Sequence, residues 1–174
     1  RGRYPYTNYF GKLTKEDEEI VTESLRKVSA TDIENKDFSQ ISDGQRQRIM
    51  LARAICQKPE VIVLDEPTAM LDPNGRKEVL RAVRKLNEEK GVTVILITHY
   101  MEEVVFADRV FVMDSGRLVM QGTPREIFSE VEKLKELRLD VPQVTLLAYE
   151  LRKSGVDLPE GILTIEELVN ALCH

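Results

Sequence analysis

Two carboxylates stand together at the end of a short apolar run, where residues 61–64 are followed by Asp65 and Glu66. A second apolar run, residues 92–98, leads into His99. One carboxylate can hold Mg²⁺ through water while its neighbour polarises a nucleophilic water, and an imidazole can bridge that water and a phosphate. Because adjacent strand residues point to opposite faces, the two acids would have different roles. These side chains are candidates for nucleotide hydrolysis; the alternative is a solvated strand end and a hydrogen-bonded histidine.

A candidate anion site precedes them, at the start of a predicted helix that opens with "SDGQ". Ser42 can cap this helix, Asp43 complements its positive end, and Gly44 lets a phosphate approach the backbone. The alternative interpretation is an ordinary capped helix without a ligand.

The elements that must position these residues follow from hydrophobic spacing. Apolar runs without alternation predict two parallel strands, residues 61–64 and 92–98, each buried on both faces. Strands alternating with helices indicate an α/β fold with a mostly parallel sheet, whose ligands bind at the carboxyl ends of the strands. We expect a first helix that begins at the Thr14–Asp17 capping signal and runs to Val28. Further helices are expected over residues 42–57, 74–90, 101–107, 124–137, 142–153 and 165–172. A β-hairpin is expected over residues 109–122, with its turn at residues 114–116.

Composition excludes several classes of protein. The 174 residues carry a net charge of −5, with no cluster of Lys or Arg free of acids, which argues against nucleic acid as a partner. Cys56 and Cys173 lie far apart, so we expect reduced thiols and no zinc site. No apolar run reaches the roughly 20 residues of a membrane span, so any link to a membrane must pass through a partner.

Four motifs in one order resemble those of the ATP-binding subunits of ABC transporters. They are "ISDGQRQR" as the signature motif, "VIVLDE" as Walker B, "AMLDP" as the D-loop and "LITH" as the H-loop. The resemblance implies a partial P-loop NTPase fold of the ABC type, with ATP and Mg²⁺ as cofactors. Where the common signature has Leu and a second Gly, this chain has Ile41 and Asp43. Polar variants occur at the second position, so we do not interpret the change as inactivation.

The resemblance also implies a role for each matching residue. In the family, the signature contacts the γ-phosphate of ATP held by the opposite subunit, the Walker B aspartate holds Mg²⁺, the next glutamate acts on water, and the H-loop histidine senses the γ-phosphate. Carried over by position, the ATP-binding residues are Ser42, Gly44, Gln45 and Asp72, the metal ligand is Asp65, and the catalytic residues are Glu66 and His99.

The phosphate-binding loop of this family has no counterpart in the sequence. A P-loop would read G-x-x-x-x-G-K-[ST], and the single Gly-Lys pair, Gly11-Lys12, is followed by Leu13 and lacks the first glycine. Either the chain is the C-terminal part of a longer protein, or it is an ATPase that has lost the loop. The start at Arg1 and the retained Glu66 and His99 favour the first explanation. In both cases, we expect no tight binding of ATP by this chain alone.

The resemblance changes along the chain. Residues 2–59 resemble the helical subdomain of iron-siderophore and vitamin B12 importer ATPases, and residues from Glu66 onward resemble the energy-coupling-factor ATPases of cobalt, nickel and vitamin importers. We hypothesise that the two kinds of sequence join near residues 66–69, either because the gene is a hybrid or because the sequence was assembled from mixed reads. We expect three parts: a helical subdomain remnant over 1–57, the ATPase core over 58–123 and a helical extension over 124–174.

The expected partners are a second ATPase subunit and a membrane permease, at the cytoplasmic face of the membrane. Residues 3–10 are candidates for the groove that receives the permease, or are ordinary core packing. The C-terminal helices either help to pair two ATPase subunits or form a packed appendage. The motifs are also compatible with two further functions. A DNA-maintenance ATPase would need long coiled-coil or zinc insertions, which are lacking, whereas a non-catalytic subunit that donates only its signature face stays open.

A missing P-loop strand would leave sheet edges and apolar surface open. We therefore expect the isolated chain to be marginally stable or to aggregate. Thermal unfolding followed by circular dichroism checks this, and a cooperative transition above about 50 °C would contradict it.

Overall fold

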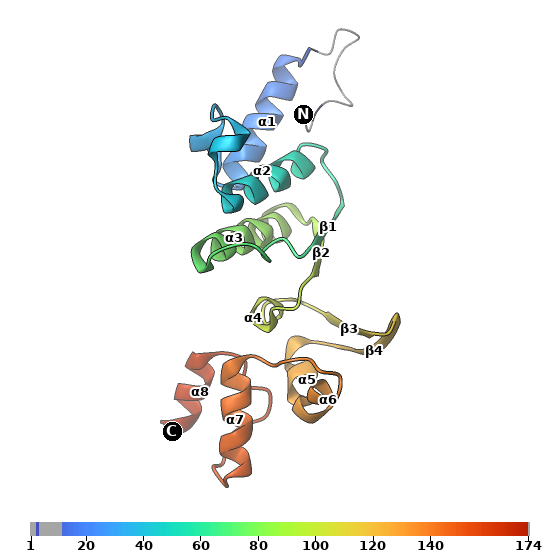
Figure 1. Ribbon diagram of the computed structural model, residues 1–174, viewed down its shortest axis with the longest axis vertical. Helices are drawn as coiled ribbons and strands as arrows, with labels where there is room; N and C mark the ends of the chain where they lie inside the picture. Colours follow the sequence, from blue (N-terminus) through green and yellow to red (C-terminus); the bar gives the residue numbers. More distant parts are fainter. Residues whose placement is uncertain (1–2, 4–11, 174) are drawn as a thin grey trace. The chain divides into compact units, whose positions relative to one another are not determined.

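The computed structural model describes Arg3 and residues 12–173. The chain forms two compact units, one ending at Ile97 and the other beginning at Thr98 (Figure 1). This boundary falls inside residues 58–123, which the sequence suggests as one part, and the three-part division stays a prediction. Residues 4–10, the candidate permease-binding segment, lie outside the described residues. Arg3 is described, and its guanidinium forms a 2.7 Å ion pair with Asp17.

Three helices and two short turns form most of the first unit. The helices are α1 (Lys15–Lys27), α2 (Asp43–Ile55) and α3 (Pro73–Lys90), and the turns are η2 (Thr31–Ile33) and η3 (Phe38–Gln40). The predicted capping box of α1 is confirmed, because Thr14 and Asp17 satisfy each other's backbone N–H groups. Helix α2 packs against both α1 and α3 (Figure 1).

Strands β1 (Val61–Asp65) and β2 (Thr93–Ile97) pair in parallel, with Val61 opposite Thr93 and Asp65 opposite Ile97. The face that carries Ile62 packs into the core under the helices. The opposite face is exposed, with Val63 60% and Ile95 49% accessible. The prediction of strands buried on both faces is therefore wrong for the described part of the chain, because its helices cover only one face of a two-stranded sheet.

The core of the first unit joins the three helices to the covered face of this sheet. Its buried members come from the three helices, β1 and the connecting loops and include Val28, Ile41, Leu51, Ile62, Val79 and Leu86, and Val94 of β2 is partly buried against them. Apolar residues at helical spacing in α1, α2 and α3 thus hold the sheet end that carries Asp65 in place.

The second unit contains a hairpin and five helices: α4 (Met101–Val104), β3 (Val110–Asp114), β4 (Arg117–Gly122), α5 (Pro124–Ser129), α6 (Val131–Glu136), α7 (Gln143–Lys153) and α8 (Ile165–Leu172). The single helix predicted over 124–137 is two helices, because Glu130 has a ψ of 51°, outside the helical range. The predicted helix over 101–107 is shorter, ending at Val104. None of the helices in the described residues is long and apolar enough to cross a bilayer.

The hairpin turns where the sequence predicts. Ser115 and Gly116 both have positive φ, 49° and 74°, as a two-residue turn matched to the strand twist requires. The strands pair antiparallel, from Val110 opposite Gly122 to Asp114 opposite Arg117. Val112 faces the core beneath α5 and α6, together with Phe128 and Leu134.

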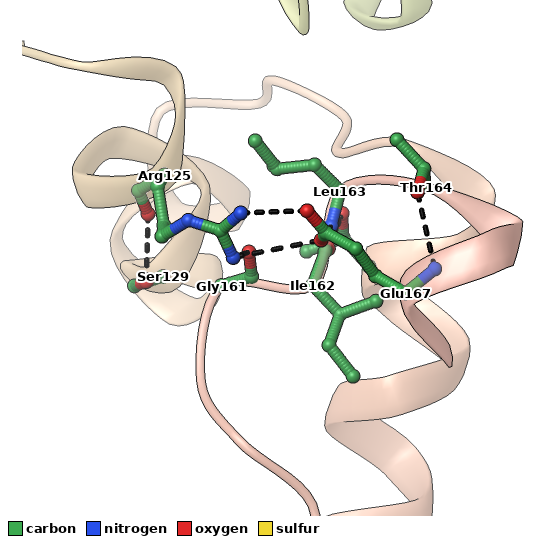
Figure 2. A network of polar contacts seen from close by, with 8 residues as sticks. Arg125, Ser129, Gly161, Ile162, Leu163, Thr164 and Glu167 are labelled. Carbon is green, nitrogen blue, oxygen red and sulfur yellow. Dashed lines mark hydrogen bonds and ion pairs between the residues drawn. The ribbon is translucent and has the colours of Figure 1, made fainter. Parts of the chain in front are cut away.

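An arginine ties α5 to the start of α8 (Figure 2). The Arg125 guanidinium forms a 2.7 Å ion pair with Glu167 and donates to the Gly161 carbonyl over 2.6 Å. Glu167 also accepts a hydrogen bond from the Leu163 N–H over 2.8 Å, and Thr164 caps α8. The hydrogen bond from Arg125, followed by that from Leu163, lowers the pKa of Glu167 below its ordinary value. The carboxylate is therefore charged and bound over the whole neutral range.

The Arg125 contact requires a glycine at position 161. Gly161 has a φ of +67°, and a Cβ there would lie 2.6 Å from Cγ of Arg125. Gly155 has a φ of +92° with no atom within 4 Å of the same position. Both Ala substitutions cost about 1–2 kcal/mol for the left-handed backbone, and Gly161→Ala costs about 1–3 kcal/mol more through overpacking. Urea unfolding of the two variants measures the difference, and equal losses would contradict the steric explanation.

Candidate functional site

The starts of α2 and α3 line one hollow of about 440 Å³ in the first unit. It contains four of the residues that the sequence identified: Ser42, Gly44, Gln45 and Asp72. The hollow is also lined by residues without an expected role of their own: Arg48, Met70, Leu71, Asn74, Gly75 and Glu78. Arg48 lies in the signature motif and Met70 and Leu71 lie in the D-loop. Asn74, Gly75 and Glu78 belong to no motif, and the packing of α3 beside α2 brings them to the hollow.

A capping box fixes the first turn of α2. The Ser42 hydroxyl accepts a hydrogen bond from the Gln45 backbone N–H over 3.3 Å, and the side-chain Oε1 of Gln45 accepts one from the Ser42 backbone N–H over 3.0 Å. The predicted role of Ser42 as N-cap is therefore confirmed. The box holds both side chains at the rim of the hollow and leaves the positive end of the helix directed into it.

The two helix starts meet backbone to backbone. A Cβ on Gly44 would lie 3.4 Å from the Cα of Gly75, so neither position has room for a long side chain directed at the other helix. Asp72 caps α3 by accepting a 2.7 Å hydrogen bond from the Gly75 N–H. The Asp72 carboxylate therefore stabilises α3 and also lines the hollow.

Asp65 and Glu66 lie at the carboxyl end of β1, as predicted, and both are exposed. Asp65 is the last residue of the strand, opposite Ile97. The Glu66 N–H continues the ladder by donating to the Ile97 carbonyl over 2.9 Å. Neither acid is among the residues that line the hollow at α2 and α3. The structure thus places the carboxylate pair in the same unit as the signature residues but outside the hollow that these residues line.

Glu66 has a left-handed backbone, with a φ of +43°. This conformation costs a residue other than glycine about 1–2 kcal/mol. It turns the chain out of the strand into a tight loop, in which Ala69 N–H donates to the Glu66 carbonyl over 3.2 Å and Thr68 is fully buried. Strain of this kind is concentrated at functional sites. The sequence contains no signal for it, because a glycine would be the usual marker of such a turn.

His99 belongs to the second unit, two residues beyond β2. The segment around it is fixed by Thr98, whose hydroxyl donates to the Glu103 carboxylate over 2.8 Å and accepts from the Tyr100 N–H over 3.0 Å. The His99 and Tyr100 rings lie 4.2 Å apart between centroids. The proximity of His99 to Glu66 stays a prediction.

Asp65 and Glu66 are suited to a metal ion that binds together with a phosphate-containing ligand. No group of three or more His, Cys, Asp or Glu side chains gathers in the described part of the chain. Mg²⁺ is commonly held by one or two carboxylates together with substrate phosphates and water. An exposed carboxylate at a strand end, such as Asp65, fits that mode of binding, whereas a resident metal would need further ligands.

Comparison with known proteins agrees with the arrangement of these motifs. Residues 4–69 match the ABC transporter family, and residues 145–174 match the C-terminal domain of the energy-coupling factor transporter EcfA1. The chain belongs to the family of ABC transporter ATP-binding proteins, as its motif order and α/β fold indicated. Curated relatives that it matches include energy-coupling factor transporter ATP-binding proteins EcfA1.

Two of these relatives show how far the similarity extends. EcfA1 of Caldanaerobacter subterraneus is 63% identical over 143 residues, which are 81% of this chain and 52% of the relative. EcfA1 of Clostridium perfringens is 55% identical over 160 residues, 92% of this chain and 57% of the relative. The chain thus spans about half the length of the curated relatives it matches. Both alignments are too long to lie on one side of residues 66–69, so they cross the suggested junction, whose origin stays a hypothesis.

Solved structures show the same fold. A metal-chelate type ABC transporter in an inward-facing conformation has a TM-score of 0.68 and 29% identity, and covers 78% of this chain and 54% of its own. The cbiO1 protein of Clostridium perfringens, part of the ABC transporter complex cbiONQ, has a TM-score of 0.66 and 33% identity over the same shares. The predicted partial P-loop NTPase fold of the ABC type is confirmed.

The left-handed backbone at Glu66 predicts an unusual ranking of variants. Glu66→Gly and Glu66→Ala both remove the carboxylate and its contacts, but only glycine adopts this φ without strain. After allowance for the greater entropy of unfolded glycine, we expect the Gly variant to be about 0.5–1 kcal/mol more stable than the Ala variant. Urea unfolding followed by circular dichroism measures the difference, and a more stable Ala variant would contradict the strain.

Proposed function

We propose that the chain forms the signature, Walker B and D-loop half of an ATP-hydrolysing subunit of an energy-coupling-factor importer. It would work as one of two ATPase subunits on the cytoplasmic face of a membrane permease and drive the uptake of a metal ion, a vitamin or a siderophore. The observation that carries the proposal is the shared hollow at the starts of α2 and α3, where Ser42, Gly44, Gln45 and Asp72 come together.

The signature face is suited to the terminal phosphate of ATP held by the opposite subunit. The positive end of α2 faces the hollow, and the Ser42 hydroxyl lies at its rim. Gly44 has no side chain to cover the backbone N–H groups of this turn. We assign Gln45 a supporting role, because its side-chain carbonyl is already used by the Ser42 N–H.

The carboxylate pair would carry the chemistry on the same chain. Mg²⁺, when bound with ATP, neutralises charge on the phosphates, and Asp65 would hold it through water. Glu66 follows directly but leaves the strand with a left-handed backbone, so its carboxylate is directed differently from that of Asp65. Glu66 is thus able to orient and polarise the attacking water while Asp65 holds the metal. His99 would contact the γ-phosphate from the segment after β2.

The names of two comparison proteins bear on the assembly. One is part of the complex cbiONQ, and another solved relative, the ATP-binding cassette MJ0796, is described as a dimer bound to ADP and phosphate; it has a TM-score of 0.56 and 30% identity. These names support a dimeric ATPase with membrane components as the working form of this chain. A further solved relative is described as a metal-chelate type ABC transporter, which fits a metal ion as cargo.

A second function is favoured by the separation of the two groups of site residues. The hollow at α2 and α3 is complete without Asp65 or Glu66. The chain could therefore donate its signature face to a competent partner without hydrolysing ATP itself, as a catalytically incompetent partner subunit or a chimeric fragment.

Hydrolysis of Mg-ATP distinguishes these functions. We expect no turnover by the 174-residue chain alone, and turnover by a fusion protein that supplies an upstream P-loop segment. Glu66→Gln in the fusion should reduce the rate by at least about 100-fold, because it removes the group that polarises water. Phosphate release measures the rate, and retained ATP binding shows that the loss is in the chemical step.

A matched substitution controls for charge. Glu60→Gln changes an exposed glutamate just before β1 in the same way and should leave turnover unchanged. If the fusion is silent while the 174-residue chain stimulates a P-loop-bearing relative, the signature-donor function replaces the first proposal. Turnover that survives Glu66→Gln would contradict the role of Glu66.

A further inference from the structure

A second hollow in the first unit, of about 200 Å³, lies between the end of α1, α2 and α3. We call it the basic hollow, because four of its lining residues are Lys27, Arg48, Arg81 and Lys85, against one acid, Glu78. Arg48 and Glu78 also line the hollow at the starts of α2 and α3, whereas the other three cations do not. The chain has a net charge of −5, so this concentration of positive charge is local.

Arg48 is buried in the wall of the basic hollow, with only 8% of its surface accessible. Its guanidinium has five N–H donors. One terminal nitrogen donates to the Ser29 carbonyl, and the other forms a 3.3 Å ion pair with Glu78. Its Nε is without a hydrogen-bond partner among the described residues. A buried charged group with more donors than acceptors is costly unless another acceptor is supplied.

Lys85 and Arg81 are weakly held. Lys85 pairs with Glu89 over 4.0 Å on the surface of α3, and an exposed pair of this kind contributes little and can be exchanged for another anion. Lys27, whose side chain is only 19% accessible, pairs with Glu23 over 3.0 Å. The side chain of Arg81, one turn before Lys85 on α3, has neither an ion pair nor a hydrogen bond within the part of the chain that the structure describes.

We propose that the basic hollow binds a small phosphate-type oxyanion. Two guanidinium groups and two ammonium groups around one cavity match the charge and the multiple acceptor oxygens of a phosphate group, which arginine recognises with two parallel hydrogen bonds. The carboxylate of Glu78 would repel the anion, so the principal contacts are expected at the exposed side chains of Arg81 and Lys85, with the Nε–H of Arg48 as a further donor. This site is independent of the proposed hydrolysis of ATP.

Titration calorimetry with inorganic phosphate and pyrophosphate tests the site on the 174-residue chain, in which no P-loop competes for the anion. We expect saturable binding with one site per chain at low ionic strength. Arg81→Gln and Lys85→Gln should each weaken it about 5- to 10-fold, because each removes one charged contact. Both side chains lie on the exposed surface of α3, and circular dichroism verifies that the variants fold like the parent.

Two controls distinguish binding in the basic hollow from general attraction of anions to the protein surface. Lys77→Gln removes the same charge from α3 outside the basic hollow, and it should leave phosphate affinity unchanged. Acetate at equal ionic strength should bind more weakly than phosphate.

The proposal is overturned if binding does not saturate, if all three variants lose affinity equally, or if acetate binds as well as phosphate. It is also overturned if Ser42→Ala abolishes binding while Arg81→Gln does not, since the anion would then occupy the start of α2. Binding with no ATP turnover in the fusion would count against the proposed function alone.

Discussion

The contact between the starts of α2 and α3 is the constraint on which the candidate site depends. Two glycines, Gly44 and Gly75, allow the backbones to approach until a Cβ on one would lie 3.4 Å from the Cα of the other. The two capping residues, Ser42 and Asp72, then fall at the rim of one hollow. A larger side chain at either glycine would separate the helices and move these caps apart. The two caps stabilise their helices and also line the hollow, so helix stability and the geometry of the proposed site are linked.

The loop from Glu66 to Asp72 connects this contact to the sheet. The ladder with β2 continues through the Glu66 N–H, and the left-handed turn that follows leads the chain past the buried Thr68 to the cap of α3. The strained residue is thus held from both sides, by the sheet and by α3. Contacts on both sides of a strained residue allow its backbone conformation to persist in a folded protein. It also means that the carboxylate of Glu66 and the hollow at α2 and α3 are set by one continuous segment of chain.

Each unit also exposes apolar surface that a closed domain would bury. Val63 and Ile95 are exposed on one face of the two-stranded sheet, and Phe111 and Met113 are exposed on the hairpin. Contiguous apolar surface of this kind is a liability for an isolated chain. By contrast, polar contacts hold α8 in the second unit, where Arg125 forms an ion pair with Glu167 and donates a hydrogen bond to the Gly161 carbonyl. The C-terminal helices are therefore well fixed among themselves, whatever further surfaces they contact.

The sequence alone determined the family, the α/β fold and the positions of most elements, because these follow from local patterns: four motifs in order, two unbroken apolar runs and capping signals such as Ser42. Only the tertiary structure decided which side chains share a hollow, since Gly75 and Glu78 reach it through the packing of two helices. It also decided that one face of each strand is exposed, that Glu130 interrupts a helix, and that Glu66 is left-handed. These features depend on contacts between distant residues, and hydrophobic periodicity carries no information about them.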